Sequence, residues 1–188
     1  MRAVLRAIPQ LMVTPSVDSA TPILAQVPRV PWFGAVGRPE CRASSHDAAA
    51  DYARACGGPP QVEWLGGWDE AARVVRALDD TSSFWSDEAR WRQQALTAAR
   101  TSGRSASLAE ALHRLSVLGY DAVRPAAPDE ELARVAAGAA LWTLAEAITW
   151  AVVDDLLAPL PNPFLPKLRL FELGHWPLGV WNGAIAIG

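Results

Sequence analysis

Apolar and polar residues alternate at helical spacing over most of the chain beyond residue 43. A period of three to four residues predicts amphipathic helices, each with one side turned toward a shared core. Serine and aspartate at the starts of these segments, and glycine at their ends, give approximate bounds. The pattern predicts helices over residues 44–56, 69–78, 87–101, 107–118 and 129–157.

The segment 129–157 is the longest and most apolar of these helices. At about 1.5 Å per residue it would run roughly 40 Å, and Gly138 offers a point for a kink. Its apolar part is long enough to cross a membrane, but its many alanines and Glu146 make insertion unfavourable. We therefore interpret it as the buried central helix of a soluble protein, with no membrane partner.

The two ends of the chain have other patterns. Six of the fifteen prolines fall between Pro9 and Pro39, and this density favours extended backbone over helix. Near the other end, Asn182 and Gly183 separate two apolar runs, which predicts a β-hairpin. We expect the outer edge of its second strand, residues 184–187, to be open to a partner's strand.

Together these patterns predict a mainly α fold with two parts. Residues 1–40 form an extended, proline-rich N-terminal arm. Residues 41–188 form a helical domain, with about five helices packed around one long central helix, which ends in a small C-terminal β-hairpin. Residues 61–65 fit a short strand, and residues 163–173 fit either a short helix or a strand.

Composition and charge narrow the class of protein. The mean hydropathy of +0.08 reflects an excess of small alanine, so nine tryptophans supply much of the core volume. The net charge of −3 lacks the basic excess of a general nucleic-acid-binding protein. Two cysteines and the lack of a recognisable signal peptide predict a reduced, cytoplasmic protein.

Two Glu-x-x-His pairs raise the question of a di-iron site, with Glu88 and Glu146 as further ligands. The pairs are Glu110 with His113 and Glu172 with His175. On a helical wheel the first pair points away from the apolar side, and Gly174 breaks the helix that would carry the second. We therefore expect neither a metal nor a cofactor.

Glu146 is the most unusual carboxylate, because it falls on the most apolar stripe of the predicted central helix. A buried carboxylate must be paired, hydrogen-bonded or protonated. In one interpretation an arginine or a nearby threonine satisfies it and the group is structural. In the other, a small ligand binds Glu146 between Trp142 and Trp150, with Thr143 beside it.

No motif in the sequence identifies a reaction. The leading hypothesis is a non-enzymatic interaction protein, such as an accessory subunit, adaptor or immunity-type protein, with a protein partner or a second copy of itself. The arm and the hairpin would form its interface, through Trp32, Phe33, His175, Trp176 and Trp181. The alternative is a helical protein, or an enzyme, that binds a small ligand or cofactor at Glu146.

Overall fold

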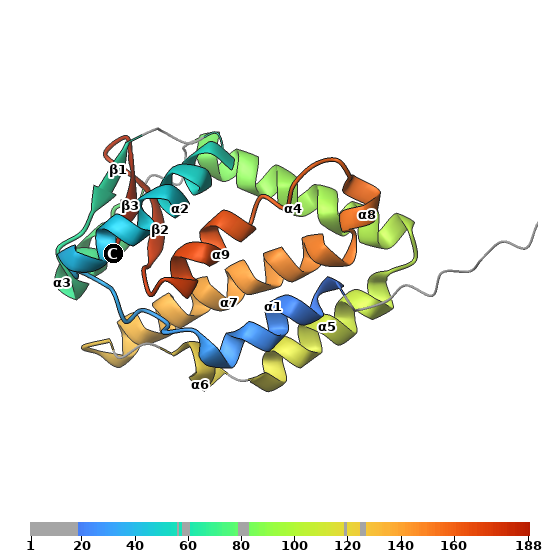
Figure 1. The fold of residues 1–188 in the computed structure, drawn as a ribbon, viewed down its shortest axis with the longest axis horizontal. Coiled ribbons are helices and arrows are strands. Elements are labelled where there is room, and N and C mark those ends of the chain that lie inside the picture. Colours follow the sequence, from blue (N-terminus) through green and yellow to red (C-terminus); the bar gives the residue numbers. More distant parts are fainter. Residues whose placement is uncertain (1–18, 56, 58–60, 79–82, 119, 125–126) are drawn as a thin grey trace, which may run out of the picture.

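The fold is mainly α, as the periodicity predicts, and a small sheet lies at one end of the molecule (Figure 1). A computed structural model describes residues 19–55, 57, 61–78, 83–118, 120–124 and 127–188. In these residues, nine α-helices and three strands are formed. They are α1 (Thr21–Gln26), α2 (Arg42–Ala55), β1 (Val62–Trp64), α3 (Trp68–Val75), α4 (Ser83–Thr101), α5 (Ser105–Leu118), α6 (Tyr120–Val123), α7 (Glu130–Val152), α8 (Asp154–Leu157), α9 (Leu165–Glu172), β2 (Pro177–Trp181) and β3 (Ala184–Ile187).

The central helix is α7, and it packs against α4, α5 and α9. The side chain of Asp129 caps its first turn by accepting a hydrogen bond from the backbone N–H of Leu132 at 2.7 Å. Four fully buried alanines line its inner side, which lets neighbouring helices approach closely: Ala136, Ala137, Ala140 and Ala147. The helix continues through Gly138 without interruption and ends at Val152.

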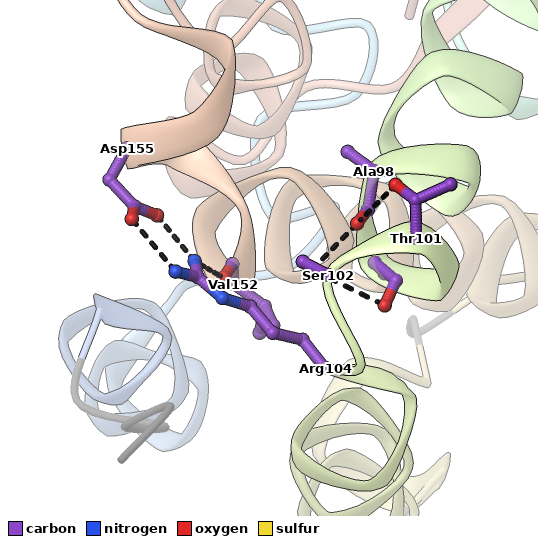
Figure 2. Close-up of polar contacts among 7 residues, drawn as sticks. Ala98, Thr101, Ser102, Arg104, Val152 and Asp155 are labelled. Atoms are coloured by element: carbon purple, nitrogen blue, oxygen red, sulfur yellow. Dashed lines mark hydrogen bonds and ion pairs between the residues drawn. The ribbon is translucent and has the colours of Figure 1, made fainter. Parts of the chain in front are cut away.

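The end of α7 is fixed by a side chain from the turn between α4 and α5. Arg104 donates a hydrogen bond to the carbonyl oxygen of Val152 at 2.9 Å and forms a two-pronged ion pair with Asp155 (Figure 2). Asp155 raises the pKa of Arg104, and the hydrogen bond from Arg104 lowers the pKa of Asp155. This contact gives one of the unpaired carbonyls at the helix end a partner and holds the start of α8.

The prediction of an extended arm is wrong for its described part. Residues 21–26 form α1, and residues 27–29 and 39–41 form 3₁₀ turns. Pro22 is compatible with helix because it lies in the first turn, where its missing N–H removes no hydrogen bond. Leu24, Val27 and Phe33 are buried, so this segment packs onto its own domain. Residues 1–18 lie outside the described residues.

The sheet confirms the hairpin and corrects the prediction of a free edge. The strand order is β1-β3-β2, with β3 antiparallel to β2 and parallel to β1. Asn182 and Gly183 both adopt positive φ, as a two-residue hairpin turn requires. Because β1 pairs with the outer edge of β3, that edge is already occupied. The ambiguous segment 163–173 contains a helix, α9, which packs with α2.

Candidate functional site

Four charged side chains from three helices form a charge cluster that is buried except for part of Arg92. It consists of Glu88 and Arg92 of α4, Glu146 of α7 and Lys167 of α9. The spacing of four residues places Glu88 and Arg92 on one side of α4, which faces α7. Nε of Arg92 donates to Oε1 of Glu146 at 2.6 Å, and Nζ of Lys167 donates to Oε1 of Glu88 at 2.6 Å.

Glu146 lies where its position on the apolar stripe predicts, with only 3% of its surface exposed. Burial raises its pKa from the ordinary 4.5 to about 7, because desolvation disfavours the charged carboxylate. Lys167 opposes this effect, the negative charge of Glu88 adds to it, and Arg92 opposes it through its hydrogen bond and charge. At neutral pH this carboxyl group therefore sits near its midpoint of protonation.

Lys167 is the single lysine of the sequence, and its side chain is 9% exposed. Its amine lies 5.9 Å from the ring centre of Tyr52 on α2, beside its ion pair with Glu88. The sequence pattern places Glu88 only among the candidate metal ligands and does not single out Lys167. The available signal was an isolated lysine among leucines in a segment where every other charge is arginine or glutamate.

Of the residues predicted to bind a ligand, Trp142 lies at the surface, and Thr143, Glu146 and Trp150 lie in the core. Trp142 is 54% exposed, and the guanidinium of Arg92 lies 4.9 Å from its ring centre. Trp150 is fully buried against Trp91 at 5.8 Å. The hydroxyl of Thr143 donates to a backbone carbonyl within α7, at 3.0 Å. Glu146 is thus joined through Arg92 to Trp142.

Three buried polar atoms in the cluster region have no hydrogen-bond partner among the described residues. They are Oε2 of Glu88, Oε2 of Glu146 and Nε1 of Trp150. Buried polar atoms are normally paired, so a small polar molecule would gain a contact at each of these positions, and a proton would gain one at the two carboxylate oxygens. In the described part of the chain, no three His, Cys, Asp or Glu side chains gather in a way that could hold a metal ion. Glu110 and His113 are both exposed on α5.

The residues predicted to form the interface lie largely inside the molecule. Phe33 and Trp176 are buried with ring centres 6.0 Å apart, and Phe33 also lies 5.5 Å from Phe171 of α9. Trp32 and Trp181 are half-buried and pack against the same core. These aromatic contacts attach the N-terminal segment to α9 and the sheet.

His175 is also buried, and both of its ring nitrogens face backbone carbonyls. Nδ1 lies 2.9 Å from the carbonyl oxygen of Gly188, and Nε2 lies 3.4 Å from that of Cys41. The ring of Trp64 packs edge-on against it at 5.1 Å. These contacts link the start of α2, β1 and the hairpin.

An apolar stripe on α7 is exposed, although the sequence pattern predicts a buried central helix. This α7 face consists of Val135, Gly138, Ala139 and Trp142, at the spacing i, i+3, i+4 and i+7. Val135 is 43% exposed, Gly138 is exposed and Ala139 is half-buried. From Glu146 to Val152 every residue of the helix is buried, so neighbouring elements cover only the second half of the stripe.

A separate apolar groove of about 360 Å³ lies between α1 and the end of α5. Leu24, Ala25 and Pro28 form one wall, while Leu118 and the 71% exposed Val117 form the other. His113 and Arg114 provide its polar rim. This groove is formed by residues outside the α7 face and the charge cluster, so it provides control positions.

Comparison with known proteins gives no family. No protein-family model matches the chain, and neither a curated protein nor a solved structure matches it.

Among the described helices, α7 alone is long and apolar enough to cross a membrane by length and composition. However, 67% of its most apolar stretch is buried inside the molecule, which is the pattern of a core helix in a soluble protein.

Proposed function

We propose that this protein acts by binding another protein, as a non-enzymatic accessory subunit or adaptor, through the α7 face. The observation that carries this proposal is the exposure of Val135 and Trp142 on one side of a well-formed helix. Exposed apolar side chains that adjoin one another are typical of protein interaction sites, whereas isolated ones are normal on any surface.

The neighbourhood of Trp142 supports this choice. Tryptophan and arginine are the residues most enriched among those that dominate binding energy at interfaces. Here Arg92 is held in place by Glu146 below and by the ring of Trp142 beside it. A side chain that is already ordered loses less conformational entropy when a partner binds.

An interface formed by the aromatic residues of the arm and hairpin would require more free energy than one formed by the α7 face. Phe33 and Trp176 contact each other and the core, so presenting them to a partner would expose buried apolar surface. The α7 face requires no such rearrangement. The proposal therefore keeps an interaction function and assigns it to a different surface.

Site-specific photocrosslinking in cells that produce the protein tests this proposal. The photoreactive amino acid benzoylphenylalanine replaces Arg134, an exposed residue at the edge of the α7 face, in one variant and Val117, the exposed control on α5, in another. We expect irradiation to give a discrete covalent adduct from position 134 and not from position 117. The proposal is wrong if position 134 gives no adduct, or if both positions give the same adducts.

Small-ligand binding at the charge cluster is a second candidate function. The unpartnered carboxylate oxygens of Glu88 and Glu146 favour a ligand that donates hydrogen bonds, such as a small primary amine. Titration of ammonium and methylammonium, followed by tryptophan fluorescence, tests it. We expect saturable quenching in the wild-type protein and none in Glu146→Gln. Equal responses in the two proteins would contradict ligand binding at Glu146.

A further inference from the structure

We infer that the partner of the α7 face is a second copy of this chain, packed antiparallel about a twofold axis between Gly138 and Ala139. This inference rests on the proposed function, because it identifies the partner of the same surface. It depends on three observations: the order of side-chain sizes along the stripe, the position of Gly138, and the charges at its two ends.

The side-chain sizes along the α7 face are self-complementary in an antiparallel pair. A twofold axis between residues 138 and 139 places Trp142 of one copy opposite Val135 of the other, and Gly138 opposite Ala139. The large indole thus meets a smaller side chain at each end, while the two smallest residues meet at the centre. In a parallel pair, Trp142 would meet Trp142 and leave a gap at Gly138.

Gly138 has no evident reason to be glycine within a single copy. It lies in the interior of α7, where glycine is unfavourable relative to alanine. A Cβ added at this position would meet nothing within 4 Å, so packing inside the molecule does not exclude a side chain. Close approach of another backbone at this exposed position would account for the glycine.

One pair of opposite charges, Glu131 at one end of the face and Arg92 at the other, is complementary in the same arrangement. Glu131 is exposed near the Val135 end and forms no ion pair with any described residue. The same axis places position 131 opposite position 146, where Arg92 lies beside Trp142. Arg92 uses Nε for Glu146, so in this arrangement its terminal nitrogens would be the donors to the partner's Glu131. A parallel pair would bring like charges together.

The expected association is weak, because the stripe from Val135 to Trp142 is only about 10 Å long. Two turns of helix bury less surface than the roughly 800 Å² per partner of a stable complex. The groove beside Val135 extends the contact onto α3, where Ala72 and Val75 line it, and it carries charges of both signs from Arg76, Asp129 and Glu131. We therefore expect a dimer with a dissociation constant in the micromolar range.

Sedimentation velocity of the purified full chain over a concentration series tests the inference. The variants are Trp142→Ser, Gly138→Leu and Glu131→Arg, with Val117→Ser and Glu110→Arg as controls on the exposed side of α5. We expect a concentration-dependent dimer in the wild type and in both controls. Trp142→Ser should raise the dissociation constant by about 30-fold or more. A monomer at all concentrations would overturn the inference. An equal rise in the dissociation constant in Glu131→Arg and Glu110→Arg would overturn it as well.

Disulfide trapping tests the position of the axis. In a background in which Cys41 and Cys56 are replaced by serine, a single cysteine is placed at Ala139 or, as the control, at Val117. We expect mild oxidation to link two copies through position 139 and not through position 117. Linking through position 117 alone would contradict the arrangement.

The two proposals fail in different ways. A photocrosslink from position 134 to a different protein, together with a monomeric purified chain, would overturn the second-copy inference and leave the proposed function standing. No adduct in cells, together with a monomeric purified chain, would overturn both.

Discussion

Arg92 connects a buried carboxylate to the surface, since its Nε lies 2.6 Å from Oε1 of Glu146 while part of its own side chain remains exposed. Its guanidinium also lies over the ring of Trp142. The positions of Arg92 and Trp142 at the surface therefore depend on the buried carboxylate of Glu146.

Stability should depend on pH through Glu146. Its pKa is about 7 in the folded protein and about 4.5 when exposed, so the folded state holds a proton more tightly. The stabilisation is complete below pH 4.5 and is lost as pH rises to 7. One pKa unit corresponds to about 1.4 kcal/mol, so the free energy of unfolding should fall by about 3 kcal/mol over this range. Urea unfolding of the wild type and Glu146→Gln at pH 5 and pH 8 measures it, and parallel pH profiles would contradict the prediction.

Removing the buried lysine should leave Glu88 without its ion-pair partner. Lys167→Met should lower the free energy of unfolding by about 3–5 kcal/mol, because Glu88 is then buried and unpaired. The double variant Glu88→Gln/Lys167→Met should recover most of this loss. Urea unfolding of the single and double variants measures it. If the double variant is as unstable as the single one, the loss comes from packing of the lysine stem.

The packed arm and the α7 face should differ sharply in their contribution to the stability of one copy. Phe33→Ala removes a buried ring that contacts Phe171 and Trp176, and should cost about 3–5 kcal/mol. Trp142→Ala removes a half-exposed ring and should cost under about 1 kcal/mol. Unfolding at low protein concentration measures both. Equal losses would mean that Trp142 belongs to the core.

Gly138→Ala should stabilise one copy, because the added methyl group enters open space and the helix gains a better helix former. The expected gain is about 0.5–1 kcal/mol in thermal or urea unfolding of dilute protein. Ala139→Gly, the reverse change at the adjacent position, should cost a similar amount. A loss of stability in Gly138→Ala would show that glycine is needed inside the monomer.

The helices and the hairpin could be predicted because their signals are local. The repeat of apolar residues fixes which side chains share a side of α5 or α7, and Asn182-Gly183 specifies the hairpin turn. The start of α5 was predicted less well: the helix begins at Ser105, two residues before the predicted start at residue 107. The packing of the proline-rich arm onto its own domain could not be predicted in this way, because it depends on the tertiary burial of Leu24, Val27 and Phe33.

The site could be predicted only in part. The apolar stripe correctly placed Glu146 in the interior, yet Trp142 and Val135 on that same stripe are exposed. Periodicity shows which residues share a side of a helix, but not how far the neighbouring helix extends along it. The partners of Glu146 come from α4 and α9, and Lys167 lies 79 residues from Glu88. A single sequence contains no local signal for such a pairing.

The enclosed amine of Lys167 makes the sequence's single lysine a chemical reporter of conformational opening. While α9 stays packed against α2 and α7, an acylating reagent or a lysine-specific protease has no access to this side chain. Acylation at Lys167 then proceeds only through states in which α9 has moved away or the chain has unfolded. Its rate, followed by mass spectrometry, would measure the free energy of that opening with no engineered label.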